Sequence, residues 1–136
     1  MSVNPSLALQ KAIIETLRAD ASLTAMLGGP RVYDRPPRRM NAPCVNIGAA
    51  EIHHWNTFTA RGHEHRLTLH VWTRHGGRKS AYEIIARLDE LLDDADLALQ
   101  DHHLVNLRAI FWTAMRADDG LFQGIMRLRA TTHPLN

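Results

Sequence analysis

The fold is decided by the stretch RLTLHVWTR, residues 66–74, in which apolar and polar side chains alternate. On an extended chain, Leu67, Leu69 and Val71 point to one face, and the arginine, threonine, histidine and tryptophan side chains point to the other. Such a strand buries one face and leaves the other accessible, which is typical of an antiparallel sheet. The Gly-Gly pair at residues 76–77 predicts the end of this strand.

The residues after this strand change from a period of two to the period of a helix. Ser80 is a candidate N-cap, and Glu83 and Arg87 stand four residues apart in the order that favours an ion pair. The helix would pack through an apolar face that recurs every three to four positions. This face consists of Ala81, Ile84, Ile85, Leu88, Leu91 and Leu92.

Two further alternating runs predict a long antiparallel hairpin near the C-terminus. The segment Asp118-Asp119-Gly120 lies between them and carries the Asp-Gly pair that favours a tight turn. We expect the apolar residues of both runs to face the helices. They are Val105, Leu107, Ala109, Phe111 and Met115 in the first strand, and Phe122, Met126, Leu128 and Ala130 in the second.

The N-terminal part predicts two helices. Asn4 followed by Pro5 is typical of a helix start, and Asp20 is a candidate cap for a second, shorter helix. The Gly-Gly-Pro sequence at residues 28–30 would end that helix. The buried residues would be Leu9, Ile13, Ile14 and Leu17 in the first helix, and Leu23, Met26 and Leu27 in the second.

Two short strands are predicted next, at residues 32–34 and 45–49, with a proline-rich loop between them. Three prolines within residues 35–43 exclude a helix interior or a central strand. We expect an exposed basic loop that is ordered by a partner. The partner-contacting residues of this loop would be Arg35, Arg38 and Arg39.

The order of elements predicts an α+β fold, a mainly antiparallel sheet with helices packed on one face. The length fits one domain, residues 1–136, and 45% hydrophobic residues suffice for a core. No apolar run approaches the roughly 20 residues of a membrane-spanning helix, and the N-terminus lacks the features of a secretory signal. A single cysteine, Cys44, excludes an internal disulfide, so we expect synthesis in a reducing cytoplasm.

Three segments, in order along the chain, resemble the tail-terminator (tail-completion) proteins of siphophages and gene transfer agents. The segments are SLALQKAI at residues 6–13, LGG at 27–29 with RVYD at 31–34, and HEHRLTLHVWTR at 63–74. The spacing from the third segment through the helix to the last hairpin also matches. The resemblance therefore covers nearly the whole chain.

This resemblance implies a structural virion-type protein with no catalytic residues and no cofactor. It implies a hexameric ring that caps the tail tube and joins it to the head-side connector. The implied partners are other copies of the chain, the major tail tube protein, a head-completion protein and the DNA that passes through the ring lumen. The implied location is the head–tail junction of a phage-like particle made in a bacterial cytoplasm.

Enzymatic interpretations find little support in the residues. His63 and His65 would share one face of a strand, with residues 53–54 nearby, but a zinc site needs three or four converging ligands. The chain has no Cys pair and no His-Glu-x-x-His helix. Cys44 has no activating motif, so a buried, inert thiol is expected. We expect surface or interface histidines and no metal, and a small metal-dependent enzyme is the weakest hypothesis.

The sheet face opposite the helices is the candidate functional surface. If the strands alternate as predicted, six arginines, a histidine and two tryptophans point to it. Antiparallel sheets often leave one face in solvent, but arginine and tryptophan are enriched where proteins meet. The expected set is Arg66, His70, Trp72, Arg74, Arg108, Trp112, Arg116, Arg127 and Arg129.

Charge is unevenly distributed along the chain, which more often serves a partner than a fold. Residues 61–79 carry five basic groups against one acidic group, and residues 80–101 carry seven acidic groups against one basic group. A ring requires two different patches that meet head to tail. We therefore expect the arginine face to meet the acidic segment of the next subunit; alternatively, the arginines line the lumen or form a nucleic-acid-binding module. The acidic residues are Glu83, Glu90, Asp93 and Asp94.

Overall fold

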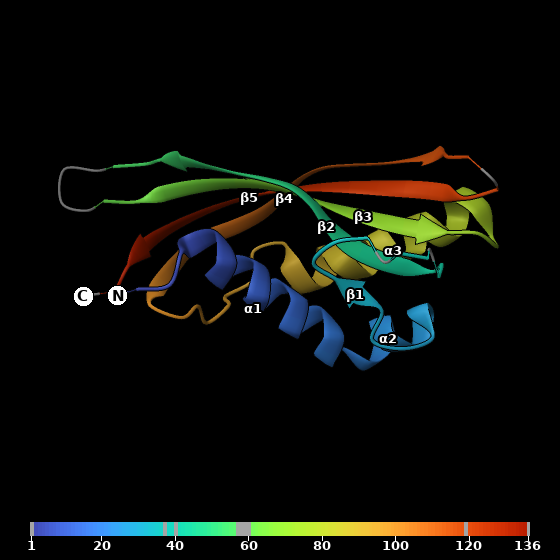
Figure 1. Ribbon diagram of the computed structural model, residues 1–136, viewed down its shortest axis with the longest axis horizontal. Coiled ribbons are helices and arrows are strands. Elements are labelled where there is room, and N and C mark those ends of the chain that lie inside the picture. The colour runs from blue at the N-terminus through green and yellow to red at the C-terminus, as the bar shows by residue number, and fades with distance from the viewer. Residues whose placement is uncertain (1, 37, 40, 57–60, 119, 136) are drawn as a thin grey trace.

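The computed structural model describes residues 2–36, 38–39, 41–56, 61–118 and 120–135. They form two layers, a sheet and a set of helices that covers one face of it (Figure 1). In chain order the elements are α1 (Pro5–Ala19), α2 (Ala21–Leu27), β1 (Val32–Tyr33), β2 (Cys44–His54), β3 (His63–Thr73), α3 (Gly77–Leu92), β4 (His102–Arg116) and β5 (Phe122–Pro134).

The five strands lie in the order β1-β2-β3-β5-β4. β1 runs parallel to β2, and each of the other neighbouring pairs is antiparallel. The predicted α+β fold, with helices on one face of a mainly antiparallel sheet, is confirmed. Among the described helices, none has the length and apolar character needed to cross a membrane.

The core lies between the helices and the inner face of the sheet, which is the face that the helices cover. Leu67, Leu69 and Val71 of β3 are buried there, as their alternation predicts. Each fully buried side chain of this kind contributes about 1.5–3 kcal/mol. The helices add Leu9, Ile13, Leu17, Leu23, Leu27, Ile84, Ile85, Leu88 and Leu92 to the same cluster.

Side-chain caps define where α1 and α2 begin, as predicted. Asn4 Oδ1 accepts a hydrogen bond from the Ser6 backbone N–H at 2.8 Å. Asp20 Oδ2 accepts one from the Leu23 backbone N–H at 2.8 Å. Gly28 follows α2 with a φ of 76°, a left-handed conformation that glycine adopts readily.

The start of α3 differs from its prediction. The helix begins at Gly77, and Gly76 precedes it with a φ of 82° and no side-chain cap. Ser80 therefore lies inside the first turn, where its N–H donates to the Gly76 carbonyl at 3.3 Å. The helix starts earlier than expected because a glycine, not a hydroxyl side chain, sets its first turn.

β2 and β3 are longer than expected and form a hairpin that extends beyond α1 (Figure 1). Ile47 pairs with Leu69 and Ala50 with Leu67, so β2 contains a bulge between these two pairs. Ala49 falls in this bulge and is exposed, whereas the alternation placed it on the core face.

The substitution Gly124→Ala is expected to destabilise the chain by about 1 kcal/mol. A Cβ atom at Gly124 would lie 2.9 Å from Ile85 Cδ1 and 3.2 Å from Val71 Cβ, and the latter cannot rotate away. Ile85→Val removes the nearer methyl group, so in urea unfolding the double variant should lose less than the sum of the two single losses. Strict additivity would show that the site has room for a methyl group.

Candidate functional surface

The outer face of the sheet, which points away from the helices, carries arginines in register across three strands. Arg66 of β3 is paired with Arg129 of β5, which is paired with Arg108 of β4. Residues directly opposite each other in antiparallel strands point to the same face. Arg127 lies two residues earlier on β5 and shares this face. The structure thus places these four arginines together, as their alternation predicts.

Carboxylates of the same subunit neutralise part of this arginine row. Glu64 lies 3.1 Å from Arg66 Nε and 2.7 Å from Arg129 Nη2. Hydrogen bonding from Arg129, reinforced by the positive charges of Arg129 and Arg66, lowers the pKa of Glu64. Arg108 Nε lies 3.1 Å from Asp93 Oδ1. The outer face is therefore less positive than a count of its arginines indicates.

Because of a bulge in β4, two predicted site residues lie on the face of the sheet opposite to the one predicted. Ala109 is paired with Leu128 of β5, and Phe111 is paired with the neighbouring residue, Arg127. Ile110, between them, is therefore an extra residue without a partner on β5. Because the alternation reverses at the bulge, Trp112 and Arg116 point to the side of the sheet that carries the helices. The prediction that they share the arginine face is wrong.

The same bulge brings predicted core residues to the surface. Phe111 and Met115 point to the outer face and are exposed, and the Arg127 guanidinium lies 5.1 Å from the Phe111 ring centroid. Val105 is the extra residue of a second bulge and is also exposed. β4 therefore presents large apolar side chains that the folded subunit does not cover.

Trp72 is on the outer face, as predicted, but its side chain is held by contacts with other residues of the same subunit. Its Nε1 donates to Asn46 Oδ1 at 2.6 Å, and its ring stacks on His70 with centroids 6.1 Å apart. His70 Nδ1 lies 2.8 Å from Gln123 Nε2, and burial lowers the pKa of His70. Arg74 is exposed one residue beyond the end of β3.

The acidic segment spans α3 and the loop that follows it. Glu83 and Glu90 are exposed on the helix. Arg87 pairs with Glu90 at 2.9 Å and with Asp20 at 2.6 Å, instead of with Glu83 as its spacing predicts. The tertiary contact with α2 turns this side chain away from the expected partner.

The loop after α3 is hydrogen-bonded to β4, so its carboxylates stand beside that strand. The Asp94 N–H donates to the Leu107 carbonyl at 2.7 Å, and Asp93 Oδ1 accepts from the Ala109 N–H at 2.9 Å. Burial, followed by the negative charges of Asp93 and Glu90, raises the pKa of Asp89. Negative charge is thus concentrated along one margin of the sheet.

The basic loop flanks the opposite margin. Arg35, Arg38 and Arg39 are exposed next to β1, as predicted, and two residues of this loop, 37 and 40, lie outside the described part of the chain. Nearby, Arg18 Nε donates to the Val32 carbonyl at 2.9 Å. This hydrogen bond attaches the end of α1 to β1.

The histidines and the cysteine differ in part from expectation. His65 and His102 are buried, because their register turns them to the inner face of the sheet. No group of three or more described His, Cys, Asp or Glu residues could hold a metal ion. Cys44 is buried, and desolvation raises its pKa to about 11, so its thiol stays protonated at neutral pH and is a poor nucleophile.

An exposed apolar edge strand, on a subunit whose two margins carry opposite charges, is typical of a structural protein that assembles with other chains. The sequence matches the family model of the tail completion protein gp17 over residues 11–133, and the chain belongs to this family. It is similar to a chain in the structure of the virion of a native gene transfer agent (GTA) particle. The two share 30% identity and a TM-score of 0.86, over 97% of this chain and 99% of that one. No curated protein sequence matches the chain.

Proposed function

We propose that this protein is a tail terminator, a non-enzymatic subunit that forms a six-membered ring on the tail tube and joins it to the head-side connector. The proposal rests on membership of the tail-completion family together with the near-complete overlap with a chain of a gene transfer agent virion. The ring would contact the major tail tube protein on one side and a head-completion protein on the other. The subunit would be made in the bacterial cytoplasm and function at the head–tail junction of the particle.

The distribution of exposed groups supports an assembly role. Nine large hydrophobic residues are exposed in the described chain, and five of them belong to β4. Because single exposed apolar residues are ordinary but a contiguous group is not, this strand is a candidate contact surface. The expected contact between the arginine face and the acidic segment is less well supported, since Arg108 already binds Asp93 within one subunit.

The outer face supports a second candidate function, a contact with nucleic acid. Arg66, Arg129 and Arg108 form a row across three strands, and Arg127 stands beside them. In a ring, this row would face the DNA in the lumen; in a free subunit, it would bind phosphates. Steeply salt-dependent DNA binding by the free protein would favour a nucleic-acid-binding module over a purely structural subunit.

Deletion of the gene is expected to stop assembly at the head–tail junction. We expect tails of abnormal length, or heads and tails left unjoined, in electron micrographs, because the proposed ring both ends the tail tube and joins it to the connector. Restoration by the wild-type gene in trans is the control. Normal numbers of infective or DNA-transferring particles from the deletion strain would contradict the proposed function.

A further inference from the structure

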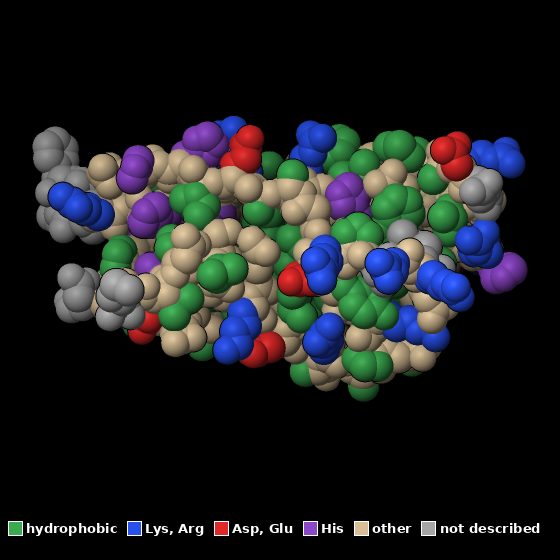
Figure 2. All heavy atoms as spheres, viewed as in Figure 1, with side chains coloured by type: hydrophobic (Ala, Val, Ile, Leu, Met, Phe, Trp, Pro, Cys, Tyr) green, Lys and Arg blue, Asp and Glu red, His purple; other side chains and the backbone are tan. Residues whose placement is uncertain are grey.

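The two margins of the sheet differ in charge. β1 and β4 are the outer strands, so the residues beside them lie on opposite sides of the subunit. We call the first the β1 side: residues 31–36 and 38–39 with the adjoining surface of α1. Figure 2 shows Lys and Arg side chains gathered over β1 and α2. The basic residues of this side are Lys11, Arg18, Arg31, Arg35, Arg38 and Arg39, against the carboxylates of Glu15 and Asp34.

The opposite margin, which we call the β4 side, consists of residues 89–96, which carry five carboxylates, and residues 110–116, which are mostly apolar but include Arg116. Asp94 and Asp96 are exposed there, and Asp94 is held against β4 by its bond to Leu107. Crowding of like charges around Asp89 is visible in its raised pKa, which burial raises first and Asp93 and Glu90 raise further. Added positive charge from outside would relieve this crowding.

Apolar side chains project from the β4 side. Ile110, pushed out by the bulge, is 55% exposed, and Trp112 is 48% exposed. Aromatic and aliphatic anchors of this kind carry most of the energy of protein contacts when they enter a pocket. The charged residues around them would set orientation more than affinity.

The β1 side is hollowed where such anchors could enter. One hollow is lined by Tyr33, Asp34, Arg35, Pro36 and Arg38. A second lies between α1 and the chain that follows β1, and its lining includes Leu7, Ile14 and Arg18. Leu7 is 64% exposed, so this hollow also offers apolar surface that the subunit leaves uncovered.

We propose that the β4 side of one subunit docks on the β1 side of a second copy of this chain, with Ile110 and Trp112 entering the hollows and residues 89–96 facing the arginines. This inference rests on the proposed ring and specifies its interface. Because the two sides differ and lie at opposite margins of the sheet, the contact is head to tail and can close a ring. Contact between two β4 sides or two β1 sides is disfavoured by like-charge repulsion.

The test changes the charges of each side separately in a deletion strain. Arg35→Glu with Arg38→Glu replaces two positive charges of the β1 side by negative ones. Asp94→Asn with Asp96→Lys removes one negative charge of the β4 side and reverses another, and asparagine tolerates the φ of 61° at position 94. Either reversal alone should lower the yield of joined particles at least about tenfold. Co-expression of the two should restore it, because alternating variants match at every contact of a six-membered ring.

The control matched to the β1-side variant is Arg78→Glu with Lys79→Glu, the same charge change on exposed residues of α3 outside both sides. Melting temperatures of the purified variants establish whether each variant folds. If the β1-side variant fails to fold, the neutral pair Arg35→Gln with Arg38→Gln replaces it, and this pair is expected to lower the yield of joined particles several-fold. A deletion strain with normal particles would overturn the proposed function. Reversals that behave like the control, or folded reversals that co-expression does not rescue, would overturn this interface alone.

Discussion

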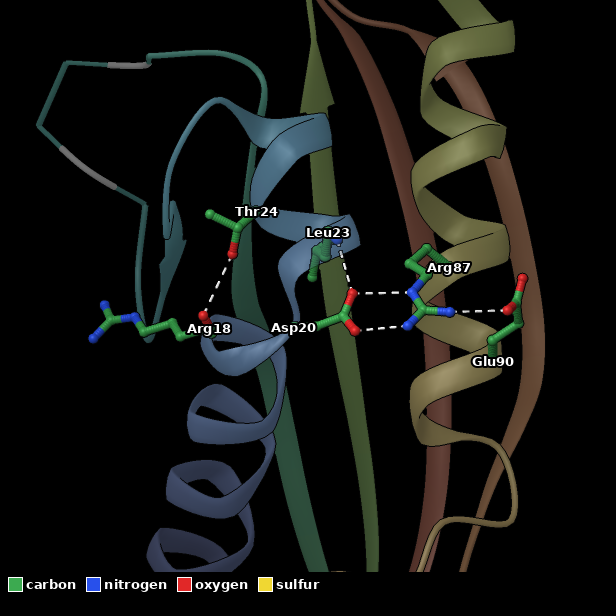
Figure 3. Close-up of polar contacts among 6 residues, drawn as sticks. All are labelled: Arg18, Asp20, Leu23, Thr24, Arg87 and Glu90. Atoms are coloured by element: carbon green, nitrogen blue, oxygen red, sulfur yellow. Dashed lines mark hydrogen bonds and ion pairs between the residues drawn. The ribbon is translucent and has the colours of Figure 1, made fainter.

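The substitution Asp20→Ala is expected to lower the melting temperature by roughly 5–10 °C, because Asp20 holds two helices in place at once. Its Oδ2 accepts hydrogen bonds from the Leu23 N–H at 2.8 Å and from Arg87 Nε at 2.9 Å, and its Oδ1 accepts from Arg87 Nη2 at 2.6 Å (Figure 3). Loss of the helix cap alone costs about 1 kcal/mol. Loss of the bidentate contact then leaves the partly buried guanidinium with Glu90 as its acidic partner.

Three further variants, Asp20→Asn, Arg87→Ala and the double variant, separate the cap from the ion pair. Asp20→Asn keeps an oxygen that can cap α2 but removes the charge that faces Arg87, so it should lose only part of the stability. The double variant Asp20→Ala, Arg87→Ala should lose less than the two single variants together, because each removes the same contact. Thermal unfolding of the four chains measures the coupling, and its absence would mean that the contact does not stabilise the fold.

The helices and the inner strands were predictable because their signals are local. Asn4 and Asp20 cap their helices through neighbouring backbone N–H groups, and the alternation of residues 66–72 is uninterrupted. The hydroxyl of Ser80 could cap a helix, but α3 begins three residues earlier, after Gly76 in the left-handed conformation. The partner of Arg87 could not be predicted, because Asp20 is 67 residues away in the chain.

The candidate surface was predicted correctly except in the part of β4 that follows the bulge at Ile110. Residues 110–112 are three consecutive apolar side chains, Ile-Phe-Trp, so a period of two fits either phase equally well. The bulge at Ile110 selects the phase, and it is defined by pairing with β5 rather than by any local signal. The opposite charges of the two margins were likewise hidden, because β1 and β4 become opposite edges only when the sheet is assembled.

The second large effect concerns His65, which is 2% exposed on the inner face of the sheet. Its Nε2 lies 2.9 Å from the buried Thr132 hydroxyl. Burial, reinforced by the positive charges that His63 and His102 can carry, lowers the pKa of His65 from 6.5 to about 4. Burial also lowers the pKa of His63, which His54 and His102 lower further. This end of the sheet therefore folds most readily with His63 and His65 neutral.

Acidification should destabilise the fold well before carboxylates titrate. Above pH 6.5, His65 is neutral in both states; below it, the unfolded chain binds a proton that the folded chain excludes until about pH 4. The free energy of unfolding should fall by about 2 kcal/mol from this group by pH 5 and by about 3 kcal/mol when the loss is complete. Urea unfolding at pH 7.5, 6 and 5 measures the slope. His65→Gln, which can still bond to Thr132 but does not titrate, should show a shallower slope, and superimposable profiles for the two proteins would contradict this role of His65.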